Sequence, residues 1–113
     1  MSEPVRLPAH LEISSIIRLV ESKGGMAAVL SKGERDAGTI LLVTMHRGEM
    51  ATLWERLPQL DGSRSFVRTK SQEPDKIREF DEYLARRSAQ DPDIWVLEVD
   101  IADTEHLVDL LPR

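Results

Sequence analysis

The sequence contains no cysteine. This absence excludes a disulfide framework, thiolate metal sites and a cysteine nucleophile, and it is typical of a reducing compartment. Aromatic residues make up only 4% of the chain, so we expect a mostly aliphatic core. No stretch approaches the roughly 20 apolar residues that span a bilayer. The N-terminal "MSEPVRLPAH" also lacks the basic and apolar regions of a secretory signal. We therefore predict a soluble cytoplasmic protein without a membrane partner.

The composition is that of one globular domain covering residues 1–113. The chain is 41% hydrophobic and 31% charged, which suffices for one modest core. Its net charge of −5 arises almost entirely in residues 71–113, where twelve acidic residues outnumber five basic ones. Because an acidic chain is a poor general binder of phosphates, nucleic acid is not the partner we expect. An unknown protein partner or self-association is the alternative.

Apolar residues at helical spacing predict two main helices and a short third one. In residues 8–23 they recur one turn apart, at Ile13, Ile16, Ile17 and Val20. Glu73-Pro74-Asp75 favours the start of the second helix, whose apolar stripe is Ile77, Phe80, Tyr83 and Leu84. Asp103-Thr104 would cap the third helix, with Leu107, Leu110 and Leu111 on one side.

The remaining segments predict four or five strands. β-branched and apolar runs mark residues 26–31, 39–46, 50–57 and 94–99, with a further candidate at 64–70. Residues 94–99 are apolar on both faces at first and suit the sheet interior, whereas the basic residues of 64–70 suit an edge. The loop 33–38 fits a hairpin. A crossover through the second helix would insert the last strand beside an earlier one.

We therefore predict an α+β fold with the order α-β-β-β-(β)-α-β-α. The sheet would be mixed and mostly antiparallel, with four or five strands. Both main helices would pack on one of its faces.

Three stretches carry a resemblance to a known family. They are "ISSIIRLVESKGGMAAVLSKGERDAGTILLV" (13–43), "EYLARRSAQDPDIWVLEVD" (82–100) and the following "EHLVDLL". With their Ala37-Gly38 and Asp91-Pro92-Asp93-Ile94-Trp95-Val96 motifs, they resemble a chiefly alphaproteobacterial family known as domain of unknown function 1491. The resemblance implies the family's fold and a bacterial cytoplasmic setting. It implies no activity, cofactor or catalytic residue.

Four carboxylates near the C-terminus raise the hypothesis of a metal site. Asp91, Asp93, Glu98 and Asp100 offer the oxygen ligands that Mg²⁺ prefers, so a metal-dependent hydrolase or nuclease is one alternative function, with Glu98 as its catalytic candidate. The competing interpretation is structural. Asp91-Pro92-Asp93 would end a helix and shape a turn. Glu98 would then form an ion pair with Arg18, Arg86 or Arg87, because burial of a lone carboxylate is costly.

A second alternative is a nucleic-acid-binding domain with a basic strand face. Arg47, Arg56, Arg64 and Arg68 are interleaved with Trp54 and Phe66, as in sheets that stack bases. Ordinary solvated edge charges explain the same pattern, and Trp54 is better suited to the core.

No complete catalytic set is visible in the sequence. The three histidines are isolated, and no serine lies in a nucleophile motif. We therefore favour a small non-enzymatic binding or protein-interaction module without a cofactor.

Overall fold

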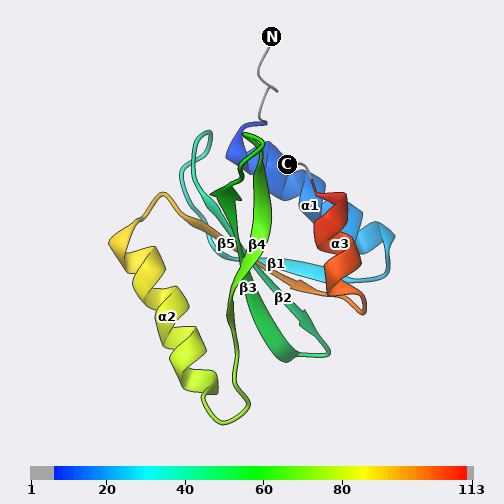
Figure 1. Cartoon of the computed structure of the whole chain (residues 1–113), viewed down its shortest axis with the longest axis vertical. Helices are drawn as coiled ribbons and strands as arrows, with labels where there is room; N and C mark the ends of the chain where they lie inside the picture. The colour runs from blue at the N-terminus through cyan, green and yellow to red at the C-terminus, as the bar shows by residue number, and fades with distance from the viewer. Residues whose placement is uncertain (1–6, 112–113) are drawn as a thin grey trace.

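The helices and strands occur in the predicted order. A computed structural model describes residues 7–111 (Figure 1). Along the chain the elements are α1 (Ala9–Ser22), β1 (Met26–Ser31), β2 (Ile40–His46), β3 (Glu49–Pro58), β4 (Arg64–Ser71), α2 (Ile77–Gln90), β5 (Trp95–Asp100) and α3 (Thr104–Leu110). The predicted α+β class and element order are confirmed, and the candidate strand at 64–70 is a full strand, β4.

The strands form one mixed sheet in the order β1-β5-β2-β3-β4. β2, β3 and β4 follow one another in the chain and pair antiparallel. β5 runs parallel to β2 and antiparallel to β1. The predicted crossover through α2 is therefore confirmed, since a parallel neighbour requires a long connection. The interior position of β5 and the edge position of β4 are confirmed as well.

The prediction of a hairpin at residues 33–38 is wrong. β5 lies between β1 and β2, so this loop crosses the end of β5 and does not join neighbouring strands. Glu34 donates its backbone N–H to the Asp93 carbonyl at 2.9 Å. Gly33 and Gly38 approach the same carbonyl so closely that a Cβ atom would come within 2.1 and 2.3 Å of its oxygen. The interior position buries both apolar faces of β5, and this outweighs the short connection between β1 and β2.

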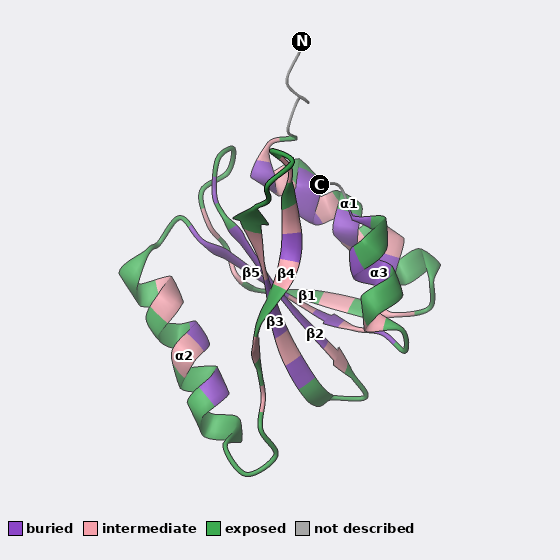
Figure 2. Cartoon of the chain, viewed as in Figure 1, coloured by how far each residue is buried: buried purple, intermediate pink, exposed green. Residues whose placement is uncertain are grey.

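Helices cover both faces of the sheet (Figures 1 and 2). One core contains Ile13, Ile16 and Val20 of α1, Leu107 of α3, and Leu42, Trp54, Trp95 and Leu97 of the sheet. The other contains Phe80 and Leu84 of α2 with Leu41, Val43, Leu53 and Val96 of the sheet. The predicted placement of both main helices on one face is therefore wrong. Because β2 and β5 alternate apolar side chains to both faces, each face needs its own cover.

Two helix details also differ from the prediction. α2 begins at Ile77 and not at the proline of 73–75, and the Ile77 side chain is half exposed. On α3, Val108 is buried and Leu110 is exposed, while the predicted cap is confirmed: the Asp103 carboxylate accepts the His106 N–H at 3.1 Å. Within residues 7–111, no helix is long and apolar enough to cross a membrane.

Candidate functional site

The predicted acidic cluster is divided between the two ends of β5. At the start, the Asp91 carboxylate accepts the backbone N–H of Asp93 at 3.0 Å and shapes the turn. At the end, the Asp100 carboxylate accepts the N–H groups of Arg47 and Gly48 at 2.8 and 2.9 Å, in the turn between β2 and β3. A six-residue strand separates the two ends by about 20 Å. Among residues 7–111, no group of three or more histidine or acidic side chains could hold a metal ion.

Glu98 lies alone in the middle of β5. Its neighbours across the sheet are Ala28 of β1 and Val43 of β2. Because Val43 and Val96 belong to the core under α2, alternation along β5 places Glu98 on the same face. The side chain is half-buried, and it makes no hydrogen bond or ion pair with another residue of 7–111. Glu98 is therefore a carboxylate at the margin of an apolar surface that has no ion pair within residues 7–111.

The arginines expected beside Glu98 lie elsewhere. The Arg87 guanidinium is 2.8 Å from the Glu55 carboxylate and donates to the Tyr83 hydroxyl at 3.0 Å. Burial tends to lower the pKa of Arg87, but the hydrogen bonds to Tyr83 and Glu55 outweigh this effect and raise it. Arg86 lies 6.0 Å from the Tyr83 ring, and Arg18 is on α1, which covers the other face. The predicted ion pair of Glu98 is not formed within the described residues.

The four predicted basic residues do not share a surface. Arg56 is almost buried, where its guanidinium holds both carboxylate oxygens of Glu12 and lies 4.5 Å from the Phe66 ring. Arg68 is 2.8 Å from the Glu105 carboxylate. Arg47 precedes β3, whereas Arg64 pairs with Pro58 at the far end of β3. Two of the four arginines are ion-paired, and the other two lie at opposite ends of β3. The four therefore do not form a continuous basic face.

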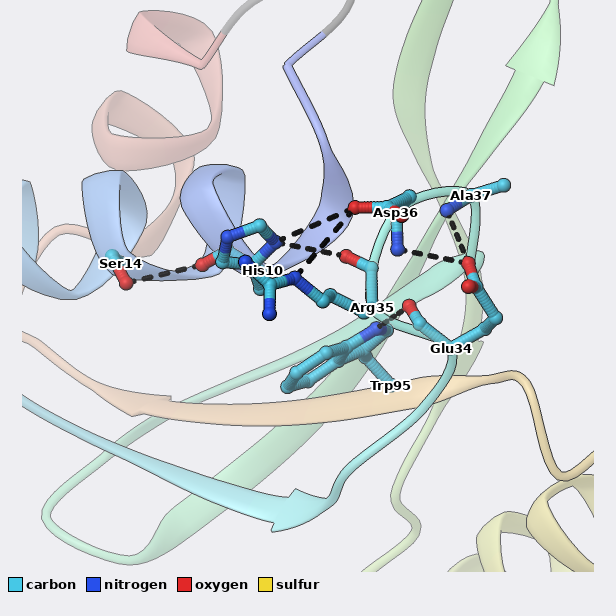
Figure 3. Close-up of polar contacts among 7 residues, drawn as sticks. All are labelled: His10, Ser14, Glu34, Arg35, Asp36, Ala37 and Trp95. Carbon is cyan, nitrogen blue, oxygen red and sulfur yellow. Dashed lines mark hydrogen bonds and ion pairs between the residues drawn. The ribbon is translucent and has the colours of Figure 1, made fainter.

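The loop 33–38 is fixed between α1 and β5 by polar contacts (Figure 3). The Trp95 indole donates to the Glu34 carbonyl at 2.7 Å. The Glu34 carboxylate accepts the N–H groups of Asp36 and Ala37 at 2.8 and 2.5 Å. The first N–H groups of α1, those of Ala9 and His10, donate to carbonyls of the same loop at 2.9 Å. The loop thus supplies partners for otherwise unpaired donors at a helix start.

A histidine lies at this corner beside a small pocket. The pocket of about 280 Å³ is lined by Pro8, Ala9 and Glu12 on the α1 side and by Asp36, Ala37 and Gly38 on the loop side. His10 Nδ1 is 3.1 Å from the Arg35 carbonyl and 3.9 Å from the Asp36 carboxylate. The Ser14 hydroxyl donates to the His10 backbone carbonyl, not to the ring. The corner therefore contains the His10 imidazole, but among the residues drawn in Figure 3 no hydroxyl group forms a hydrogen bond with that ring, as a nucleophile and its base would.

The two edges of the sheet differ in chemistry. β1 reads "MAAVLS", without a charged residue or proline, and its larger apolar side chains, Met26, Val29 and Leu30, are 70%, 42% and 51% exposed. β4, at the opposite edge, carries Arg64, Arg68 and Lys70. Basic residues and proline are the usual protection of an edge against pairing with another chain. β1 lacks both, and Figure 2 shows it in pink and green beside the buried β5.

Comparisons with known proteins identify the family of this chain. The sequence profile of the family described as "Protein of unknown function (DUF1491)" matches residues 7–109. The chain belongs to the DUF1491 family. A crystal structure of a DUF1491 family protein from Caulobacter crescentus CB15 is 30% identical, with a TM-score of 0.76 over 90% of this chain and 94% of that one. Protein Atu0922 from A. tumefaciens, solved in solution, is 28% identical, with a TM-score of 0.73 over 96% and 98%.

Another DUF1491 structure, determined by NMR, is similar to this chain to the same degree. It also comes from Caulobacter crescentus CB15 and is 31% identical, with a TM-score of 0.72 over 92% of this chain and 94% of that one. No curated protein matches the chain. The predicted family is therefore confirmed, and no relative's activity can be transferred.

Membership of the DUF1491 family gives the recognised motifs a structural meaning. The glycine-bounded loop 33–38 and the Asp-Pro-Asp-Ile-Trp motif are far apart in sequence, yet they form one corner through Glu34, Asp93 and Trp95. The segment that sequence reasoning passed over is β1. Its sequence predicts a strand, and six residues without a charge are typical of a strand inside a sheet. The edge position of β1 could therefore not be predicted from its sequence.

Proposed function

We propose that this DUF1491 protein is a non-enzymatic cytoplasmic protein-interaction module that binds an extended segment along β1. The observation that carries the proposal is the uncharged, proline-free edge at β1 with exposed Met26, Val29 and Leu30. On its outer side β1 forms no ladder with another described strand. Its outward N–H and C=O groups therefore provide a template for one more strand.

Strand addition would use both the free backbone groups and the exposed side chains of β1. Main-chain hydrogen bonds supply affinity in this binding mode, and alternate side chains supply specificity. β1 keeps a continuous antiparallel register with β5 from Met26 to Val29, so these residues have regular strand geometry. Exposed apolar side chains stand beside the strand and add apolar contact area for an incoming segment.

The positions of the other candidate residues support binding over the two alternative functions. The four carboxylates of the hydrolase hypothesis are spread along β5, and two of them cap turns. Of the four arginines of the nucleic-acid hypothesis, two form ion pairs with Glu12 and Glu105. Neither set converges as its chemistry requires.

Titration with synthetic peptides tests the proposal. The probe is a nine-residue peptide of alternating threonine and leucine, and its matched control carries N-methyl groups on backbone nitrogens of both edges. We expect the probe to bind and the control to bind at least about tenfold more weakly, because strand addition needs free N–H groups. Calorimetry gives the affinities, and amide chemical shifts should map the contact to β1.

A pair of protein variants separates strand addition from general stickiness. Val29→Lys puts a charge on the exposed edge of β1 and should abolish binding. Ser71→Lys puts the same charge on an exposed residue of β4 and should leave the affinity unchanged. Equal binding of the N-methylated peptide, or shift changes confined to α2 or to the 33–38 corner, would contradict the proposal.

A further inference from the structure

Glu98 is a charged residue next to the exposed strand β1. Glu98 lies on β5, directly opposite Ala28 of β1, and faces the α2 side of the sheet. Its side chain is half-buried and forms no ion pair among residues 7–111. A carboxylate at the margin of an apolar surface loses hydration and gains most from an added cation. Val43 and Val96 lie on the same face, as does Asp100, whose carboxylate is already held by the N–H groups of Arg47 and Gly48.

We propose that the extended segment bound along β1 carries a lysine or arginine opposite Ala28 and that this basic side chain pairs with Glu98. The inference rests on the proposed strand addition and names the chemistry of the partner. Directly opposite residues in a ladder share a face, so a side chain opposite Ala28 points to the same side as Glu98.

The spacing permits this contact. The incoming strand and β5 would lie two strand spacings apart, about 9.6 Å, with β1 between them. Ala28 is the residue in between, and its methyl group leaves room above β1. A long basic stem can lie over such a small apolar residue and carry its charge to the carboxylate. Met26, two residues away on the same face and 70% exposed, offers an apolar contact for the partner's neighbouring side chain.

This charge argument favours a basic segment of another protein over a second copy of this chain. Twofold antiparallel pairing of β1 with itself must join corresponding faces. The registers with the greatest overlap are centred on Ala28 or Val29, and they place an uncharged β1 residue opposite Ala28. Self-pairing in those registers would leave Glu98 uncompensated in both copies. The net charge of −5 also favours a basic partner through long-range attraction.

Three matched peptides test the inference. They share the alternating threonine and leucine pattern and differ only at the central residue, which is leucine, lysine or glutamate. Against the unmodified protein, we expect lysine to bind about tenfold more tightly than leucine, and glutamate to bind more weakly than leucine. The gain from lysine should shrink as salt is added, because the pair is only partly buried.

Two protein variants assign the gain to Glu98. Glu98→Gln keeps the shape and removes the charge, so lysine and leucine peptides should bind it equally. Asp109→Asn removes one charge from an exposed residue of α3 on the opposite face and should keep the full preference for lysine. Thermal unfolding of both variants checks that they are folded.

The outcomes separate this inference from the proposed function. If the leucine peptide binds β1 and lysine gives no advantage, the role of Glu98 is contradicted and strand addition stands. If no peptide binds, both are contradicted. If light scattering shows a dimer whose β1 amide signals change on dilution, a second copy occupies the edge and the basic partner is ruled out.

Discussion

The ion pair between Glu12 and Arg56 determines what the basic side chain of Arg56 binds. Glu12 is only 7% exposed, and the guanidinium of Arg56 binds both of its carboxylate oxygens. The two positions are 44 residues apart in the chain, so no local pattern links them. The nucleic-acid alternative placed Arg56 on a basic strand face, but the contact with α1 makes it a partner for a buried charge.

Removal of Arg56 should therefore destabilise the fold. Arg56→Met leaves Glu12 buried without a cation, and we expect the free energy of unfolding to fall by about 3 kcal/mol. The double variant Glu12→Leu/Arg56→Met removes both charges and should recover most of that loss. Urea denaturation of Arg56→Met, Glu12→Leu and the double variant measures the difference. A double variant as unstable as the sum of the two single ones would show that the pair is not coupled.

Individual helices and strands were predictable where their own sequence sets their position. β5 is apolar on both faces in its first half, which indicates an interior strand, and the length of α2 indicates the crossover that leads to it. Asp103 marks the start of α3 because its side chain accepts a backbone N–H three residues later. In contrast, the loop 33–38 depends on Asp93 and Trp95, which lie some sixty residues away. Local pattern cannot supply such a contact, and the hairpin prediction failed for that reason.

The cap of α3 gives a prediction for that helix. Asp103→Ala removes the acceptor of the His106 N–H and should lower the stability by about 1 kcal/mol. The effect reaches the core because Leu107 of the same helix is fully buried. Asp109→Ala, an exposed position on α3 with no role in the cap, is the control and should change stability much less. Thermal unfolding measures both variants, and equal losses would contradict a specific role of the cap.

Taken as a whole, the molecule is a sheet with both faces covered and two unlike edges. The position of α2 opposite α1 and α3 was not predictable from helix patterns, because amphipathic stripes say that a helix packs but not on which face. The edges follow from strand order, and this order comes from tertiary contacts. Basic side chains protect β4, whereas β1 exposes an uncharged strand beside Glu98, which forms no ion pair in the part of the chain that the structure describes. This asymmetry leads to the proposal that β1 binds the partner.

Amide hydrogen exchange tests that claim most directly. On addition of the lysine-centred peptide to the full chain, the outward-facing N–H groups of β1 should exchange more slowly, because each becomes a donor to the added strand. Amides of β4 at the other edge should keep their rates. Slower exchange confined to β1 is the result we predict. Unchanged rates in β1 under conditions where the peptide is bound would contradict strand addition at this edge.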